Sequence, residues 1–383
     1  MIRLRRLQFV PLLALAVLFG RPGGSLLFAA DAATASAADE AFEGQSLTLR
    51  AEVEGGEGPY RYLWFKDYVP LLDATSAELK FDALKPTDAG TYWVTVFNDG
   101  GSTTSTPEII SVRRAQPSRV ANVSVVGPAG ERMLVGFTLG GSGTTGSTAV
   151  LARAAGPALA QFGILGALAD PVLSVFRDGL LVSMNDDWGD DPALSTTSAA
   201  VGAFPFSTLS KDSALVSSLA ASSYSVEVVD GSNGAGITVV ELYDTTTKSD
   251  LTSPRLINVS ARGTAGGSEA PLTAGFTIQG DQSVTVLVRG LGPTLDRLGV
   301  TGGVSNPKLS LFRGTVLLST NERWGEVAGA AIEGAQTAVG AVPLNVDSRD
   351  AALLISLKPG SYIAQVSSTT DLGAAQIEIY EVP

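Results

Sequence analysis

One loop gathers most of the side chains in this sequence that could hold a metal ion. Within residues 185–191, five short side chains carry oxygen atoms: Asn185, Asp186, Asp187, Asp190 and Asp191. Such oxygens are the ligands that a hard cation such as Ca²⁺ prefers, although the spacing is not that of an EF-hand. The alternative is a polar turn in which these side chains bond to nearby backbone groups while Trp188 packs on the rest of the fold.

A second stretch of the chain helps to choose between a calcium site and a turn. Residues 321–326 read Asn-Glu-Arg-Trp-Gly-Glu, so that the tryptophan and the glycine return. Arg323 stands where Asp187 stands in the first stretch. A cation site would lose a ligand and gain a positive charge there. We therefore favour the structural turn and keep calcium in the first stretch as the alternative.

Two arginines stand just before rigid turns. Arg153 precedes Gly156 by three residues, Arg289 precedes Gly292 by three, and a proline follows each glycine. Proline fixes the backbone of such a turn. The guanidinium could contact a ligand, or it could pair with a carboxylate or with loop carbonyls. We favour the second, structural interpretation.

The tryptophans could form flat surfaces on which sugar rings stack. The chain has four of them: Trp64, Trp93, Trp188 and Trp324. Trp64 lies in an apolar run that is typical of a core strand. Trp93 alternates with the apolar Val94, and successive side chains of a strand point to opposite faces. Trp93 is therefore the better candidate for an exposed platform.

The sequence contains no histidine and no cysteine. Ser-His-Asp and Cys-His catalysis and zinc sites built on these ligands are therefore excluded. Disulfide bonds are excluded too, so an apolar core must stabilise each domain. Paired carboxylates could still hydrolyse glycosides, but no spacing in the sequence reveals such a pair. Residues 140–146 are rich in glycine but lack the lysine of a phosphate-binding loop.

Residues 119–243 and 255–380 are two copies of one stretch of chain. Trp188 and the Gly-Pro pair recur 136 positions later, and a closing tyrosine, Tyr243, recurs as Tyr380. Two copies predict two domains of like fold, joined by a short linker at residues 245–254 like beads on a string.

Each copy is expected to consist almost entirely of strands. Runs rich in β-branched residues predict strands at 147–153 and 283–289 with two apolar faces, as expected between packed layers. Further strands are predicted at 224–229, 237–243, 362–366 and 376–380, as closing hairpins with Asp230 and Gly231 in the first turn. Short helical turns are predicted at 158–163 and 294–299, with no other convincing helix.

The first part of the chain carries a different set of strand signals. Residues 44–49, 62–65 and 88–98 alternate apolar and polar positions. They resemble an immunoglobulin domain of the intermediate set. The resemblance implies that Trp64 is the buried tryptophan of the sandwich and that Tyr92 forms the tyrosine corner. Ala51 and Val94 stand at the family's two cysteine positions, so apolar packing would replace the disulfide.

The second half of each copy resembles the bacterial pre-peptidase C-terminal domain. The matching stretches are 170–179, 185–187 and 224–228 in the first copy, and 306–312, Asn321 and 359–362 in the second. The resemblance implies a jelly-roll-like β-sandwich of the kind that follows many secreted enzymes. The sequence departs from this family at Val172 and Lys308, where an acid is expected.

The N-terminus has the pattern of an export signal. Arginines at positions 3, 5 and 6 precede an apolar run at 9–19, and small residues allow cleavage near Ala35 or Ala37. The run is too short to span a bilayer, and no later segment is long and apolar enough. The formal net charge of −12 disfavours nucleic acids and anionic membranes as partners. We expect a secreted, periplasmic or cell-surface protein without a membrane span in its mature form.

These observations predict an acidic all-β protein with little helix apart from the signal segment. The expected parts are a leader at 1–37, an immunoglobulin-like domain at 40–113, and jelly-roll-like β-sandwich repeats at 119–247 and 255–383. We expect non-enzymatic binding, adhesion or extracellular scaffolding, with an unknown extracellular protein or polysaccharide as partner and no cofactor unless Ca²⁺ binds in the first repeat. The alternatives are a carbohydrate-binding accessory module and, as a remote third, a carboxylate-based glycoside hydrolase.

Overall fold

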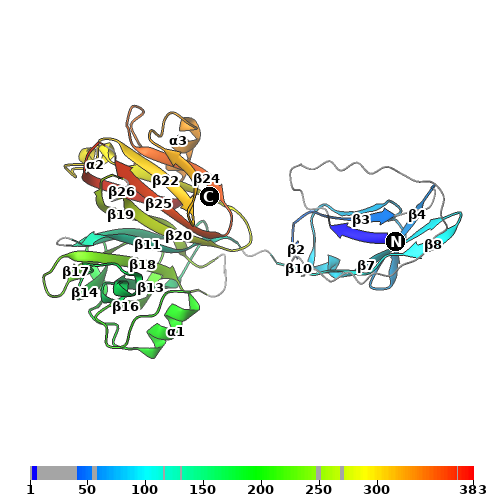
Figure 1. The fold of residues 1–383 in the computed structure, drawn as a ribbon, viewed down its shortest axis with the longest axis horizontal. Helices are drawn as coiled ribbons and strands as arrows, with labels where there is room; N and C mark the ends of the chain where they lie inside the picture. The colour runs from blue at the N-terminus through cyan, green and yellow to red at the C-terminus, as the bar shows by residue number, and fades with distance from the viewer. Residues whose placement is uncertain are drawn as a thin grey trace. The chain divides into compact units, whose positions relative to one another are not determined.

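A computed structural model describes residues 2–6, 41–53, 58–114, 117–129, 132–246, 252–267, 271–368 and 370–383. The described residues lie mostly in strands with a few short helices, which confirms the expected all-β fold (Figure 1). The chain divides into two compact units, Met1–Ala115 and Gln116–Pro383. The apolar run and the cleavage positions of the expected leader lie outside the described residues, whereas residues 2–6 form a strand.

The first unit consists of two main sheets. One contains β1 (Ile2–Arg6), β3 (Leu47–Val53) and β6 (Glu78–Phe81). The other contains β5 (Val69–Leu71), β4 (Arg61–Lys66), β7 (Gly90–Asn98), β8 (Gly101–Thr104) and β9 (Glu108–Ile110). In addition, β2 (Ala41–Phe42) pairs in parallel with β10 (Val112–Arg113), and a short 3₁₀ turn, η1 (Pro86–Asp88), precedes β7.

The core of this unit has the features of an immunoglobulin-like sandwich. Trp64 is fully buried and donates its indole N–H to the Ser76 carbonyl at 2.9 Å. The Tyr92 hydroxyl donates to the Asp88 carbonyl at 2.8 Å, as a tyrosine corner does, and burial raises the pKa of Tyr92 to about 12. Ala51 and Val94 are buried in the same cluster. The immunoglobulin-like fold is confirmed, and apolar side chains fill the cysteine positions.

The second unit contains eight strands from each copy. The first copy provides β11 (Arg119–Ala129), β12 (Met133–Gly140), β13 (Ser147–Ala155), β14 (Pro171–Arg177), β15 (Leu180–Asn185), β16 (Ser213–Ala220), β17 (Ser222–Asp230) and β18 (Gly236–Asp244). The second copy provides β19 (Arg255–Ala265), β20 (Leu272–Gln279), β21 (Val284–Leu291), β22 (Pro307–Arg313), β23 (Val316–Asn321), β24 (Ala351–Leu357), β25 (Gly360–Ser368) and β26 (Gly373–Glu381).

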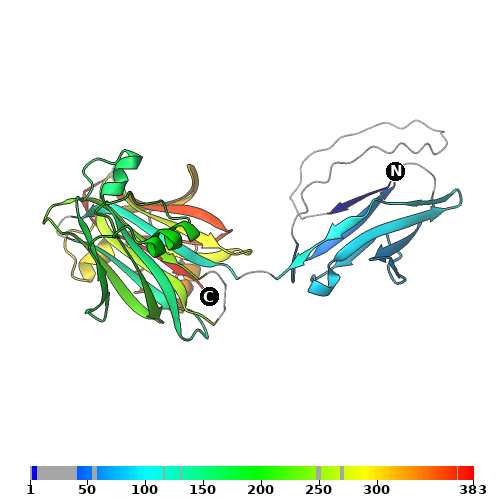
Figure 2. The ribbon, with the colours of Figure 1, turned by 90° about the horizontal axis from the view of Figure 1, so that it is seen from below.

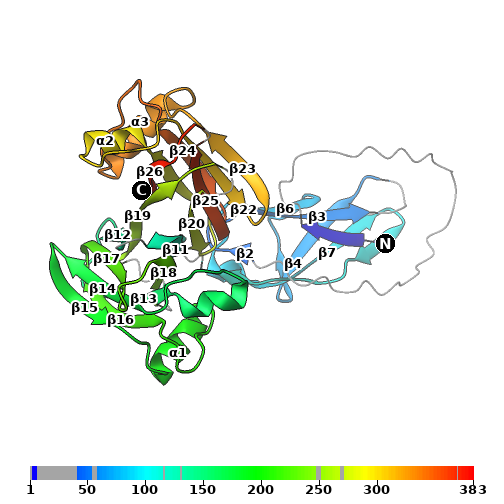
Figure 3. The same cartoon turned by 60° about the vertical axis from the view of Figure 1, so that its left-hand side comes forward.

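These strands form two long ladders, each of which runs through both copies. One has the order β16-β13-β18-β11-β20-β25-β22-β23, and the other β24-β21-β26-β19-β12-β17-β14-β15. The ladders touch where Val120 pairs with Leu256. Figures 1 and 3 show β11, β19 and β20 side by side at the junction of the copies. Each copy is thus half of a continuous double-layered body.

The junction between the copies is symmetric. Phe137 in β12 faces Val259 in β19, and the equivalent Phe276 in β20 faces Val123 in β11. One apolar cluster contains buried residues from both copies, including both phenylalanines. The expectation of two beads on a string therefore differs from the structure. The first two strands of each copy lie at the edge of its sheets, and antiparallel pairing with the other copy satisfies their peptide groups.

The expected closing hairpins are not formed. β17 pairs with β12 and β14, whereas β18 pairs with β11 and β13, so these consecutive strands lie in different ladders. The same holds for β25 and β26. The turn at Asp230 therefore does not close a hairpin, and the Asp230 carboxylate accepts backbone N–H groups from Ser232 and Ala169 where the chain crosses between the ladders. The residue ranges predicted for these short strands were correct, but the predicted pairing between them was wrong.

Short helices and loops cover the outer faces of β13 and β21. The expected turns are η2 (Pro157–Phe162) and α2 (Pro293–Arg297), while α1 (Pro192–Ala200) and α3 (Gly329–Ala338) were not expected (Figures 2 and 3). Leu151 on β13 is buried under this cover, while its neighbour Val150 belongs to the core between the ladders. Both faces of these strands are therefore buried, as predicted. Among the described residues, no helix is long and apolar enough to cross a membrane.

Candidate ligand-binding face

The acidic loop forms a set of separate local contacts. The Asn185 side chain accepts the Ala214 N–H at 3.0 Å, and Asp187 pairs with Lys211 at 2.9 Å. Asp190 accepts the Leu209 N–H at 3.0 Å, and Asp191 caps α1 by accepting the Ala193 N–H at 2.7 Å. Asp186 contributes its backbone carbonyl, which accepts the Ser213 hydroxyl at 2.7 Å. These are the contacts of a structural turn.

The loop does not collect these side chains around one point. Among the described residues, no group of three or more acidic side chains is placed to hold a metal ion. Trp188 packs against Phe206, with ring centroids 6.2 Å apart, in the cluster that covers β13. Calcium binding in this loop stays a prediction, and the contacts of the five side chains offer it little support.

Both arginines of the Gly-Pro turns are buried and paired, as the structural interpretation predicts. Arg153 lies 3.0 Å from the Glu241 carboxylate, donates to the Phe204 carbonyl at 2.6 Å, and stacks on the Phe206 ring at 3.9 Å. Burial raises the pKa of Glu241, while the Arg153 charge opposes the rise. Burial also lowers the pKa of Arg153. These groups stabilise one another.

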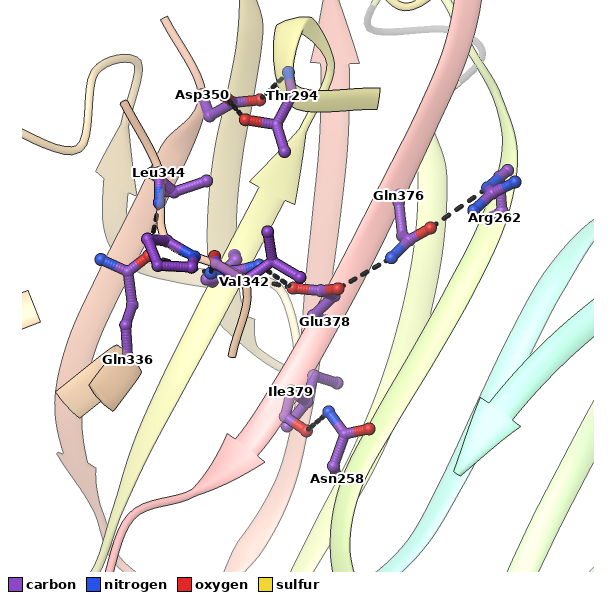
Figure 4. Close-up of polar contacts among 12 residues, drawn as sticks. Asn258, Arg262, Thr294, Gln336, Val342, Leu344, Asp350, Gln376, Glu378 and Ile379 are labelled. Atoms are coloured by element: carbon purple, nitrogen blue, oxygen red, sulfur yellow. Dashed lines mark hydrogen bonds and ion pairs between the residues drawn. The ribbon is translucent and has the colours of Figure 1, made fainter. Parts of the chain in front are cut away.

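The second copy builds a longer buried polar network at the same place (Figure 4). Arg289 donates to Glu378 at 2.7 Å and to Gln336 of α3 at 2.9 Å. Gln376 donates to Glu378 at 2.8 Å and accepts from Arg262 at 3.1 Å. The network ties α3 to β26 and β19 through groups that are nearly all hydrogen-bonded, which is how a fold accommodates buried charge.

A buried aspartate holds the Gly-Pro turn in each copy, and the sequence did not reveal this role. Asp212 is fully buried and accepts the N–H groups of Gly156 and Ala158 at 2.7 and 3.1 Å. In the second copy, Asp350 accepts the Gly292 N–H at 2.8 Å and the Thr294 hydroxyl at 2.6 Å. Both aspartates orient the backbone. The recurrence of an aspartate 138 positions later was the available signal.

The best candidate for a binding site is the outer face of the second sheet of the immunoglobulin-like unit. On β4, Trp64 points into the core, so Leu63 and Phe65 point outward. On β7, Tyr92 and Val94 point inward, so Trp93 points outward. The register pairs Phe65 directly with Trp93. Alternation on two neighbouring strands thus brings large apolar side chains together on the solvent side.

Three rings form a platform on this side, which we call the aromatic face: Phe65, Tyr68 and Trp93. The Phe65 and Trp93 rings are stacked, with centroids 5.4 Å apart and planes 7° apart. Tyr68 meets Trp93 edge-on at 5.1 Å and 66°, and is 87% exposed. Aromatic pairs at such distances hold each other in place. The stacked Phe65–Trp93 pair is therefore preorganised and partly exposed, and Tyr68 beside it is fully accessible from solvent.

The turn that presents Tyr68 has an unusual backbone. Asp67 and Tyr68 join β4 to β5 with φ values of 47° and 68°. Such values suit Asn and Gly, and a bulky residue there costs on the order of 1–3 kcal/mol. Two hydrogen bonds hold the turn, from the Asp67 N–H to the Thr91 carbonyl at 2.9 Å and from the Thr91 N–H to the Asp67 carboxylate at 2.8 Å. Retained strain of this kind is typical of functional positions.

Two hollows in the described surface do not offer an acid pair for catalysis. One, of about 480 Å³, is bounded by α1 and the end of β18, and its carboxylate, Asp244, lies 3.4 Å from Arg119. The other, of about 410 Å³, lies over residues 71–80 and is lined by two acids, Asp73 and Glu78, of which Glu78 is paired with Arg50 and Lys80. Neither shows the two facing free acids that glycoside hydrolysis requires.

Sequence patterning found part of the aromatic face. Trp93 was expected to face outward because it alternates with Val94, and the structure confirms this. Phe65 stands next to Trp64 and follows from the same alternation, but it was assigned no role. Tyr68 could not be found in this way, because its position depends on the backbone of a turn. The unusual Asp-Tyr pair at the turn was the only available signal.

Comparisons with known proteins include a short sequence match. No protein-family profile matches the chain. A decoration protein of Escherichia phage T5 is 46% identical over 54 residues, which are 14% of this chain and 33% of that protein. The matched stretch thus spans about a third of the length of this curated relative.

Solved structures give weaker likenesses. Immunoglobulin domains 1–4 of Sidekick-1 are 14% identical at a TM-score of 0.19, with 88% of this chain and 70% of that chain covered. Three N-terminal domains of the bacteriophage RB49 Highly Immunogenic Outer Capsid protein are 11% identical at a TM-score of 0.19, with 89% of both chains covered. Scores this low do not establish a common overall arrangement.

Proposed function

We propose that the chain is an exported, non-enzymatic binding protein whose immunoglobulin-like unit holds its ligand on the aromatic face. The observation that carries this proposal is the stacked Phe65–Trp93 pair with the exposed Tyr68 beside it. Large rigid aromatic side chains contribute much contact area and lose little conformational entropy on binding. The site of action would be outside the cytoplasm, in the periplasm or at the cell surface.

The exposed aromatic ring of Tyr68, next to the partly exposed Phe65–Trp93 pair, favours a carbohydrate ligand. The C–H face of a sugar ring is apolar and can lie on an aromatic ring, while its hydroxyls need polar neighbours. Thr95 on β7 and Thr104 on β8 provide hydroxyls beside the platform, 3.0 Å from each other. The net charge of −12 favours neutral over acidic glycans, because like charges repel.

A protein surface is the second candidate ligand. The short stretch of 46% identity to a phage decoration protein supports attachment to a larger assembly. An exposed aromatic face is also typical of the centre of protein interfaces. Both candidates use the same face, so the same substitutions test both.

The test is a binding screen of the full chain against neutral glycans and cell-wall polymers. Trp93→Ala removes the centre of the platform, and we expect it to weaken binding about 30-fold or more, as for a hot-spot residue worth about 2 kcal/mol. Tyr68→Ala should weaken binding less, because Tyr68 lies at the rim. Isothermal calorimetry against the best ligand measures both effects.

The matched control is Leu72→Ala, which removes an exposed apolar side chain outside the platform. It should bind like the wild type, and circular dichroism should show that all three variants are folded at the temperature of the binding measurement. Full affinity in Trp93→Ala would refute the aromatic face as the site. The second candidate would be supported if the chain binds a protein partner but no glycan, and if Trp93→Ala loses the binding to that protein.

A further inference from the structure

The two ladders of the second unit end in similar edge strands. β15 closes one ladder and β23 closes the other, while the strands at the opposite ends, β16 and β24, are less exposed than these two. Among the described strands, β15 pairs only with β14, and β23 pairs only with β22. The outer edge of each strand therefore presents peptide groups without a strand partner, which is a template for pairing with another strand.

Both edge strands expose apolar side chains at equivalent positions. Leu180, Leu181 and Val182 are 74%, 55% and 46% exposed, and the side chains 136 positions later are similar. Those are Val316, Leu317 and Leu318, at 62%, 52% and 41%. The loops that follow β15 and β23 differ in charge between the copies, whereas the apolar residues within the two strands are similar. The runs are thus a shared property of both copies.

Neither edge carries the charges that usually protect such strands. The sequences Leu-Leu-Val-Ser-Met-Asn and Val-Leu-Leu-Ser-Thr-Asn contain no lysine, no acid and no proline. Natural edge strands are commonly protected by these residues. A bulge is present in each strand, at Val182 and at Leu318. It bends the strand, so a partner can pair over a short stretch only.

The chain itself shows how its edges are used. At the opposite side of each copy, the edge strands β11 and β12 pair antiparallel with β20 and β19 of the other copy. The two copies of the repeat therefore already associate with each other by continuing a sheet across their edges. Two copies meet no like charges at the contact itself, because both edge strands are uncharged, and salt screens the longer-range repulsion between two acidic molecules.

We infer that β15 pairs antiparallel with β15 of a second copy of this chain, and that β23 pairs in the same way with β23 of another. An antiparallel pair of identical strands is closed by a twofold axis. Because each molecule has two such edges, association continues beyond the dimer into linear assemblies. The bulges keep each contact short, so the assembly is reversible. This inference does not depend on the ligand of the aromatic face.

The test is sedimentation velocity of the full chain over a wide concentration range. The wild type should pass from monomer through dimer to larger species as its concentration rises. Leu181→Lys places a charge in β15 and should stop association at the dimer formed through β23. Leu317→Lys should stop it at the dimer formed through β15, and the double variant should stay monomeric. Hydrogen exchange should slow at the amides of β15 and β23 when the wild type associates.

Two controls separate edge pairing from other contacts. Leu165→Lys places the same charge on a loop residue that is 86% exposed, and Trp93→Ala removes the aromatic face; both should associate like the wild type. Circular dichroism and melting temperature verify that each variant is folded. The inference is overturned if the wild type stays monomeric up to its solubility limit. It is equally overturned if the double variant associates like the wild type, or if Trp93→Ala abolishes association.

Discussion

At the scale of single residues, the buried Arg153–Glu241 pair is expected to have a large effect on stability. The Arg153 and Glu241 side chains are 1% and 6% exposed. Taking both charges out of water is costly, and their mutual attraction compensates for this cost only while both are present. The tyrosine beside them, Tyr243, donates its hydroxyl to Glu241 at 2.9 Å, and burial raises its pKa. Arg153, Glu241 and Tyr243 therefore form one buried polar unit.

Removing one charge of this unit should be more harmful than removing both. We expect Glu241→Gln to lower the free energy of unfolding by about 3–5 kcal/mol, because Arg153 is left buried and unpaired. The double variant Arg153→Met/Glu241→Leu should lose less than this. Urea unfolding of the full chain measures both values.

Glu227→Gln is the matched control for the buried pair. Glu227 lies 3.4 Å from Arg132 at the surface, where a salt bridge contributes at most about 1 kcal/mol. If Glu241→Gln were as mild as Glu227→Gln, or if the double variant were the least stable of the three, the buried pair would not have the role assigned to it.

At the scale of elements, the acidic loop is a connection that carries α1 onto the outer face of β13. Asp191 caps the helix, Asp190 holds the returning backbone, and Trp188 packs beneath. The side chains of Asp187, Asp190 and Asp191 thus each have a backbone or lysine partner within the protein. A cation would have to displace these contacts before it could bind.

Calcium should therefore leave the stability of this loop unchanged. We expect the same melting temperature for the full chain in millimolar Ca²⁺ and in chelator, because a ligand stabilises a protein only when it binds the folded state. A rise in calcium would contradict the structural turn. In that case the variant Asp186→Asn/Asp187→Asn shows whether the loop is the site, because the rise should vanish in it.

Elements could be predicted from the sequence where neighbouring residues alone determine them. Runs of β-branched residues located β13 and β21, and alternation placed Trp93 on the outside. The pairing of β17 and β18 was not predictable, because the choice of ladder depends on strands far away in the sequence. α1 was missed because its side chains are small and polar, although Asp191 followed by Pro192 is a helix-start signal.

At the scale of the whole second unit, the shared ladders make the two copies depend on each other. β11 pairs with β20 and β12 pairs with β19, so each of these strands is completed by a strand of the other copy. The main apolar cluster includes Phe137 and Phe276 together with residues from both copies. Separation would expose two strand edges and part of this core on each copy.

An isolated first copy should therefore not exist as a stable monomer. We expect a fragment of residues 117–246 to form dimers through β11 and β12 or to remain poorly folded, whereas 117–383 should unfold in one cooperative transition. Light scattering and circular dichroism of the two fragments measure this difference. A monomeric 117–246 fragment that melts at the temperature of the longer fragment would show that the copies are independent.

The symmetric junction also has a consequence for how the two copies can diverge. In an assembly of identical chains, every substitution appears at both symmetric places at once. Covalent fusion removes this constraint, because the two halves are encoded separately. One half now holds Asp187 against Lys211, while the other places Arg323 beside Glu326. The second unit can therefore keep symmetric strand ladders while the loops of its two copies acquire different charged residues.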